Sequence, residues 1–175
     1  SRPVSNNAPA IFPLGATIVT FTASDLSGNS GQAQATVTIA DQTPPVISLI
    51  GASSITLNIG DVFTDPGTSV SDNVSSGLTA TVTGSVNTSA VGSYTLNYNV
   101  SDAAGNAAVE VSRTVNVVDN VAPNVIAPAS ITVAATDASG TASTDTSITA
   151  FLNAATANDA VDGSRPVSNN APAIF

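Results

Sequence analysis

The stretch "SYTLNYNVSDAAGNAAVEVSRTVNVVD" (residues 93–119) predicts a β-hairpin and, with it, the fold class. On both sides of "AAGN", apolar and β-branched residues alternate with polar ones, which is the pattern of a strand with one buried face. The same pattern occurs upstream, where "TIVTFTASD" (17–25) and "QAQATVTIAD" (32–41) flank "LSGNSG". Both hairpins contain a Gly-Asn turn after an Asp, and Asp25 and Asp102 are offset by 77 residues (102 − 25). The offset indicates two related domains.

Prolines mark the predicted domain boundaries. "ADQTPPVISL" (40–49) and "VDNVAPNVIA" (118–127) each end a strand with Asp and restart at Pro, whose fixed φ and missing amide suit a linker at an edge strand. Short, evenly spaced strands with almost no helix signal predict an all-β chain of β-sandwiches. We expect the C-terminal strands of one sandwich, then an intact sandwich, then the N-terminal strands of another, in residues 1–41, 42–120 and 121–175.

The segment "SRPVSNNAPAIF" occurs twice, as residues 1–12 and as residues 164–175. Such an identity cannot be accidental, so the offset of 163 residues (164 − 1) indicates one period of a longer tandem array. Each end of the chain is then half of a sandwich, with open strand edges and an exposed core. We expect a neighbouring copy to complete it, residues 124–163 of one copy pairing with residues from about 1 to 41 of the next. The neighbour is either the next repeat of a longer covalent chain or a second chain joined head to tail, and both give an open filament.

The composition argues against several classes of function. The chain has 12 acidic residues, three arginines, no lysine and a net charge of −9, so we expect neither nucleic acid nor an anionic membrane surface as a partner. The apolar runs fall far short of the roughly 20 residues that a membrane-spanning helix needs. Without Cys, His or Lys there is no disulfide, no cysteine metal site, and no conventional general base or activated nucleophile. We therefore predict a non-enzymatic, extracellular or cell-surface protein.

Two family resemblances rest on these stretches. "FPLGATIVTFTASDLSGN" (residues 12–29), read as the continuation of residues 124–163, resembles a hyalin repeat, although the Cys pair of many such repeats is missing. "NIGDVFTDPGTSVSDN" (58–73) together with the hairpin at 93–119 resembles the bacterial immunoglobulin-like domains of large repetitive surface adhesins. The resemblances imply tandem immunoglobulin-like β-sandwiches, one intact and one split between the two chain ends.

Acidic residues are predicted to meet at the junctions between domains. In an immunoglobulin-like sandwich the B–C and F–G loops lie at the end where the first strand enters from the linker. In the intact sandwich this end gathers five oxygen donors: Asp41, Asp72, Asn73, Asp102 and Asn106. The split sandwich offers an equivalent set, whose last two members come from a different repeat than the others: Asp119, Asn120, Asp159, Asp162, Asp25 and Asn29. Calcium takes about six to eight oxygen ligands, so we predict calcium at each junction. "VDNVAP" (118–123) also resembles the linker of cadherins, whose calcium ions stiffen successive domains.

A purely structural interpretation of the same acids remains open. Asp before Gly-Asn is favoured in turns because its side chain accepts turn amides, and linker Asp residues can simply solubilise a strand end. Asp61 and Asp65 are interpreted as strand-start and turn residues. Tyr94 resembles a tyrosine corner, and Tyr98 is predicted to lie in the core.

These observations predict a spacer repeat of an extracellular filament or giant adhesin, stiffened by calcium. Its partners would be neighbouring copies of the same repeat and, at the cell surface, possible matrix or surface molecules. The alternative is a glycan- or protein-binding accessory module of a secreted hydrolase. The scarcity of aromatic residues, five Phe and two Tyr, argues against a glycan platform.

Overall fold

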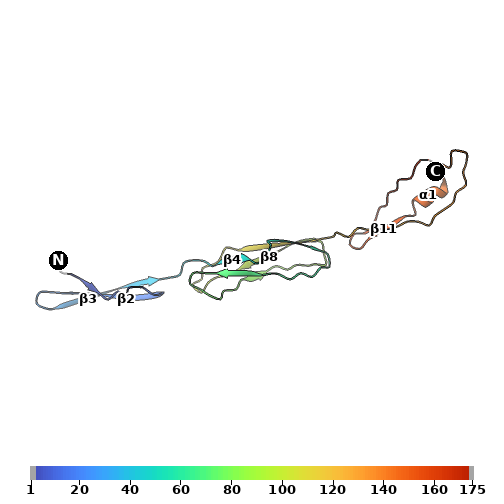
Figure 1. Ribbon diagram of the computed structural model, residues 1–175. Helices are drawn as coiled ribbons and strands as arrows, with labels where there is room; N and C mark the ends of the chain where they lie inside the picture. The colour runs from blue at the N-terminus through green and yellow to red at the C-terminus, as the bar shows by residue number, and fades with distance from the viewer. Residues whose placement is uncertain (1–2, 174–175) are drawn as a thin grey trace. The chain divides into compact units, whose positions relative to one another are not determined.

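The computed structural model describes residues 3–173, and the regular secondary structure of these residues consists of β-strands apart from one short helix (Figure 1). The expected all-β, immunoglobulin-like sandwich fold is confirmed. The outermost positions of the repeated segment, 1–2 and 174–175, lie outside the described residues. Contacts divide the chain into two units, Ser1–Val117 and Val118–Phe175. Across residues 3–173, no helix has the length and apolar character needed to cross a membrane.

The first sheet is formed by the predicted N-terminal hairpin. Its strands follow the order β1-β2-β3, with bounds Ser5–Asn6, Gly15–Ser24 and Ser30–Ile39. Strands β2 and β3 pair antiparallel along their whole length, from Gly15 opposite Ile39 to Ser24 opposite Ser30. The pleat therefore gives the hairpin one polar face, where Gln34 donates to Thr20, and one apolar face.

The middle part of the chain forms a sandwich of two sheets. Strand β4 pairs with β6 in one sheet, and the other sheet has the order β5-β9-β8-β7. The bounds are Val46–Leu49 (β4), Ser54–Asn58 (β5), Thr68–Ser71 (β6), Thr81–Thr83 (β7), Gly92–Asn99 (β8) and Val111–Val118 (β9). The hairpin predicted from residues 93–119 is confirmed as β8 and β9, which pair antiparallel.

The core of the sandwich follows from the alternation in β8 and β9. Leu96 and Tyr98 of β8 are buried and pack with Ile47 of β4. Val115 and Val117 of β9 are also buried. The predicted tyrosine corner and core tyrosine are both confirmed: the Tyr94 hydroxyl donates to the carbonyl of Ala90 at 2.9 Å, and Tyr98 is 2% exposed.

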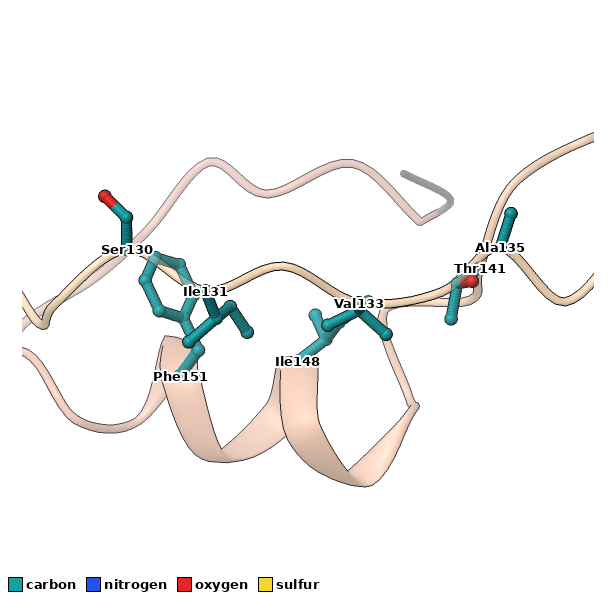
Figure 2. Close-up of a pocket in the computed structure, with 7 residues that line it drawn as sticks. All are labelled: Ser130, Ile131, Val133, Ala135, Thr141, Ile148 and Phe151. Carbon is teal, nitrogen blue, oxygen red and sulfur yellow. The ribbon is translucent and has the colours of Figure 1, made fainter.

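The second unit contains a small sheet and the one helix of the described residues. Strands β10, β11 and β12 pair antiparallel and span Asn124–Ile126, Thr156–Asp159 and Gly163–Arg165. The expectation of almost no helix missed α1 (Thr146–Leu152), which begins after Asp145, whose carboxylate accepts the Ser147 and Ile148 amides. Ile148 and Phe151 of α1 face an extended segment that contains Ile131 and Val133 (Figure 2). Seven residues are too few for helical periodicity to show in the sequence.

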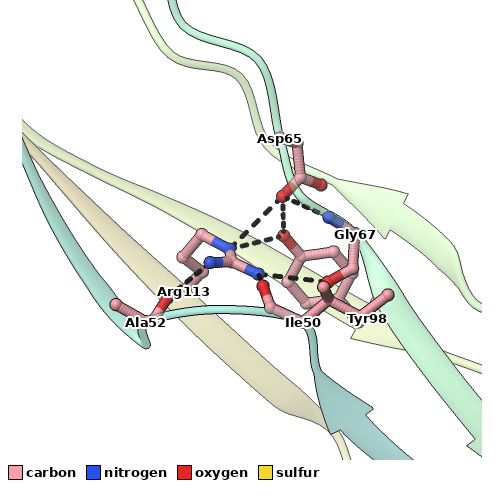
Figure 3. A network of polar contacts seen from close by, with 6 residues as sticks. All are labelled: Ile50, Ala52, Asp65, Gly67, Tyr98 and Arg113. Atoms are coloured by element: carbon pink, nitrogen blue, oxygen red, sulfur yellow. Dashed lines mark hydrogen bonds and ion pairs between the residues drawn. The ribbon is translucent and has the colours of Figure 1, made fainter.

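A buried arginine holds a network of polar contacts inside the sandwich (Figure 3). Arg113 is fully buried at an inward position of β9, and its guanidinium donates to the carbonyls of Ala52, Ile50 and Gly67. Its Nε lies 3.3 Å from a carboxylate oxygen of Asp65 and donates to the Tyr98 hydroxyl, which in turn donates to Asp65. Asp65, expected only as a turn residue, is therefore also the counter-charge of the core.

Candidate metal site

The β8–β9 turn holds its aspartate in one conformation. One carboxylate oxygen of Asp102 accepts the backbone N–H of Asn106 at 2.7 Å, and the other accepts its side-chain amide at 2.7 Å. Gly105 makes this turn possible by adopting φ 92°. The same Asn106 amide donates to the backbone carbonyl of Asp41 at 3.2 Å, so the turn and the linker are joined. Although burial opposes ionisation, the hydrogen bonds from Asn106 hold the pKa of Asp102 below its usual value.

The linker and the loop after β6 each contribute one more aspartate, and one carboxylate oxygen of each accepts backbone N–H groups. Asp41 Oδ1 accepts the Thr43 amide at 3.1 Å. Asp72 Oδ2 accepts the amides of Val74 and Ser75 at 2.9 and 2.7 Å. These local hydrogen bonds fix each carboxylate and leave its other oxygen without a hydrogen bond.

The three aspartates converge. One oxygen from each of Asp41, Asp72 and Asp102 lies within 4.8 Å of the others, and Asp102 is only 7% exposed. Asp41 Oδ2 and Asp72 Oδ1 are buried and have no hydrogen-bond partner. Buried, unpaired carboxylate oxygens close to other carboxylates are costly unless a cation neutralises them. Hard oxygen donors from three separate segments fit calcium, with carbonyls and water completing its shell.

The structure assigns different roles to the two asparagines predicted beside this cluster. Asn106 lies in the cluster as a donor to Asp102 and Asp41. Asn73 is exposed next to Asp72. Metal binding by any of these residues stays a prediction.

The second unit repeats two of the three aspartates with the same local bonds. Asp119 Oδ1 accepts the Val121 amide at 3.0 Å, as Asp41 does in the first linker. Asp159 Oδ1 accepts the amides of Val161 and Asp162 at 2.8 and 3.0 Å. The backbone N–H groups of Asp162 and Val161, together with a side-chain contact to Asp119, lower the pKa of Asp159. Asp119 and Asp159 therefore correspond to two of the three aspartates of the first cluster.

The remaining residues of the second set lie in the β2–β3 turn, beside Asp159 and in the linker. Asp25 and Asn29 belong to the β2–β3 turn of the other unit, where Asn29 donates to Asp25 as Asn106 does to Asp102. Asp162 is exposed and lies 3.7 Å from Arg165. Asn120 is exposed in the linker.

Comparisons with known proteins bear on the middle of the chain. No curated protein matches the sequence. A lipoprotein of Bacteroides thetaiotaomicron, known from its crystal structure, is 30% identical over 45% of this chain, with a TM-score of 0.38; the match spans 39% of the lipoprotein. The hyalin-repeat resemblance of the two chain ends stays a prediction. The family described as "Bacterial surface protein, Ig-like domain" matches residues 47–117, which contain most of the intact sandwich, and this match supports the immunoglobulin-like resemblance predicted from its sequence.

Proposed function

We propose that the chain is a spacer repeat of an extracellular filament or surface adhesin, stiffened by calcium at its junctions and completed head to tail by a neighbouring copy. Its immunoglobulin-like domain is of a bacterial surface type, and that family is typically non-enzymatic. The observation that carries the proposal is the cluster of Asp41, Asp72 and Asp102, which lies where the linker enters the sandwich.

The mechanism is mechanical. Asp41 belongs to the linker between β3 and β4, whereas Asp72 and Asp102 belong to loops of the sandwich itself. Without a cation, repulsion among the three carboxylates opposes their meeting and weakens the attachment of the linker, which the hydrogen bond from Asn106 to the Asp41 carbonyl supports. A calcium ion bound by all three residues would attach the linker to the sandwich and restrict its angle. Repeated along an array, this restriction converts a hinged string into a rod.

Small-angle X-ray scattering of the full chain tests the proposal. Calcium should increase the maximum dimension and narrow the distribution of conformations, and a chelator should reverse both changes while the circular dichroism of the strands stays constant. The Asp72→Asn variant should resemble the chelated protein in either condition. Scattering curves that do not change with calcium or chelator contradict the proposed function.

A further inference from the structure

The second unit has an apolar groove with an unpaired strand-like edge. A cavity of about 420 Å³ lies between α1 and residues 130–136, lined mainly by Ile131, Val133, Ile148 and Phe151 (Figure 2). In "SITVAAT" (130–136), apolar residues alternate with polar ones as in a strand, yet residues 127–135 form no strand. Ile131 is 46% exposed. The groove is thus one side of a core whose other side is missing.

The intact sandwich shows what the missing side is. Its strand β5 begins with the same letters, "SIT" (54–56), and pairs with β9. The amide of Thr114 in β9 also donates to the carbonyl of Ser53 at 2.9 Å. By this correspondence, residues 130–136 lack an equivalent of the β8–β9 hairpin.

The β2–β3 hairpin is that equivalent. Phe21 and Tyr98 stand at the same distance before the turn, and Ile39 and Val117 each pair with the glycine that begins the preceding strand. Tyr98 and Val117 are 2% and 1% exposed in the sandwich core, whereas Phe21 and Ile39 are 38% and 39% exposed. Val19 is the buried exception on the apolar face of the hairpin, at 4% exposed. The hairpin therefore carries half of a core and leaves most of it uncovered.

The repeated segment indicates where the hairpin belongs. In its first copy, Ser5 and Asn6 pair with β2, and Asn7 Oδ1 accepts the Thr20 amide at 2.7 Å. In its second copy, Ser164 and Arg165 of β12 pair with Asn158 and Ala157 of β11. Strands β2 and β11 pair with different positions of the repeated segment, because Ser5 and Asn6 correspond to residues 168 and 169, which follow β12. A single copy of the segment can consequently join β11 on one side to β2 on the other.

The same placement completes the second acidic cluster. Asp25 and Asp102 accept the same hydrogen bonds in their turns: Oδ1 accepts the backbone N–H of the asparagine, and Oδ2 accepts its side-chain amide. In the intact sandwich that turn meets the linker and the loop after β6. A hairpin seated in the groove of the second unit brings Asp25 to Asp119 and Asp159 in the same way.

We propose that the β2–β3 hairpin of a second copy docks in the groove of the second unit, with β3 pairing along residues 130–136 and Asp25 joining Asp119 and Asp159. The inference rests on the head-to-tail completion in the proposed function and names the surfaces that achieve it. Because the hairpin and the groove are different surfaces of one chain, the contact is heterologous and propagates into an open series.

Sedimentation velocity of two variants of the full chain, separate and mixed, tests this contact. Ala35→Asp places a charge on the apolar face of the hairpin, and Val133→Asp places one in the groove; both residues are outside the sandwich core. Each charge should weaken self-association at least about 100-fold, because a buried unpaired charge is strongly unfavourable. The wild type should form a concentration-dependent series of oligomers. Each variant alone should be monomeric, and a mixture should form dimers and stop there, since only one intact groove and one intact hairpin can meet.

Two controls separate this inference from the calcium proposal. Thr36→Asp changes the polar face of the same strand and should assemble like the wild type. Asp72→Asn removes a carboxylate of the first cluster but leaves both docking surfaces unchanged. It should therefore assemble like the wild type, even if calcium no longer stiffens the junction of Asp41, Asp72 and Asp102. A monomeric wild type, or a mixture of the two variants that stays monomeric, overturns the docking of the hairpin.

Discussion

Replacing Asp72 by Asn should stabilise the calcium-free domain and abolish its response to calcium. Asp41 and Asp72 place carboxylate oxygens no more than 4.8 Å apart, and one oxygen of each is buried without a partner. At an effective dielectric constant of about 20, two unit charges at this separation repel by about 3 kcal/mol. Even full screening at physiological salt, with a Debye length of about 8 Å, leaves roughly 2 kcal/mol, and partly buried charges are screened less than this. An asparagine oxygen can still accept the Val74 and Ser75 amides, so the loop itself is preserved.

Thermal unfolding followed by circular dichroism measures the effect. A gain of roughly 2 kcal/mol raises Tm by about 8–16 °C for a domain of this size when calcium is absent. For the wild type, calcium at 100 times its Kd adds about 2.7 kcal/mol, because it binds the folded state alone. Asp72→Asn should lose most of this increment, since it lacks one charged ligand. Asp61→Asn is the matched control: Asp61 is an exposed acid outside the cluster that accepts the Asn58 amide, and its replacement should leave the calcium response unchanged.

Two results would contradict repulsion and calcium binding at this cluster. If Asp72→Asn is less stable than the wild type in chelator, repulsion does not dominate the cluster. If calcium raises the Tm of both proteins equally, the ion binds elsewhere.

Three further predictions concern the sandwich. Asp65→Ala leaves the buried Arg113 without its counter-charge and should cost about 3 kcal/mol in urea unfolding, whereas Glu110→Ala, an exposed acid, should cost under about 1 kcal/mol; equal costs would contradict the ion-pair argument. Gly84→Ala should destabilise far more than Gly77→Ala, because both glycines have positive φ but only at Gly84 would a Cβ meet a backbone oxygen, that of Thr95, at 2.2 Å. Burial raises the pKa of Tyr98, so the stability that its neutral phenol contributes is complete below about pH 10 and is lost as pH rises through the raised value. In Tyr94→Phe, Tyr98 is the one remaining tyrosine, so the midpoint of the tyrosinate absorbance titration should lie above about pH 10. A midpoint at the ordinary value would show that Tyr98 is solvated.

The hairpins and the location of the acidic cluster follow from the sequence because they depend on local rules. Alternation and the Gly-Asn turns define β2–β3 and β8–β9, and the topology of an immunoglobulin-like sandwich then brings Asp41, Asp72 and Asp102 to one end. The unpartnered oxygens of the cluster are visible only once side-chain conformations are known.

Other features depend on contacts that the sequence does not display. Arg113 occupies an inward strand position where an apolar residue is expected, and its acceptors lie 46 to 63 residues away. Pro66 and Gly67 predict a turn at Asp65, but its hydrogen bond from Tyr98 spans 33 residues and has no local signal. Long-range hydrogen bonds of this kind leave no periodic signal.

Anomalous diffraction from crystals of the full chain grown with calcium can show directly whether the three aspartates bind the ion. We expect an anomalous peak at about 2.3–2.6 Å from oxygens of Asp41, Asp72 and Asp102, with the linker held against the sandwich. Absence of a peak there, with the three carboxylates turned away from one another, would contradict it.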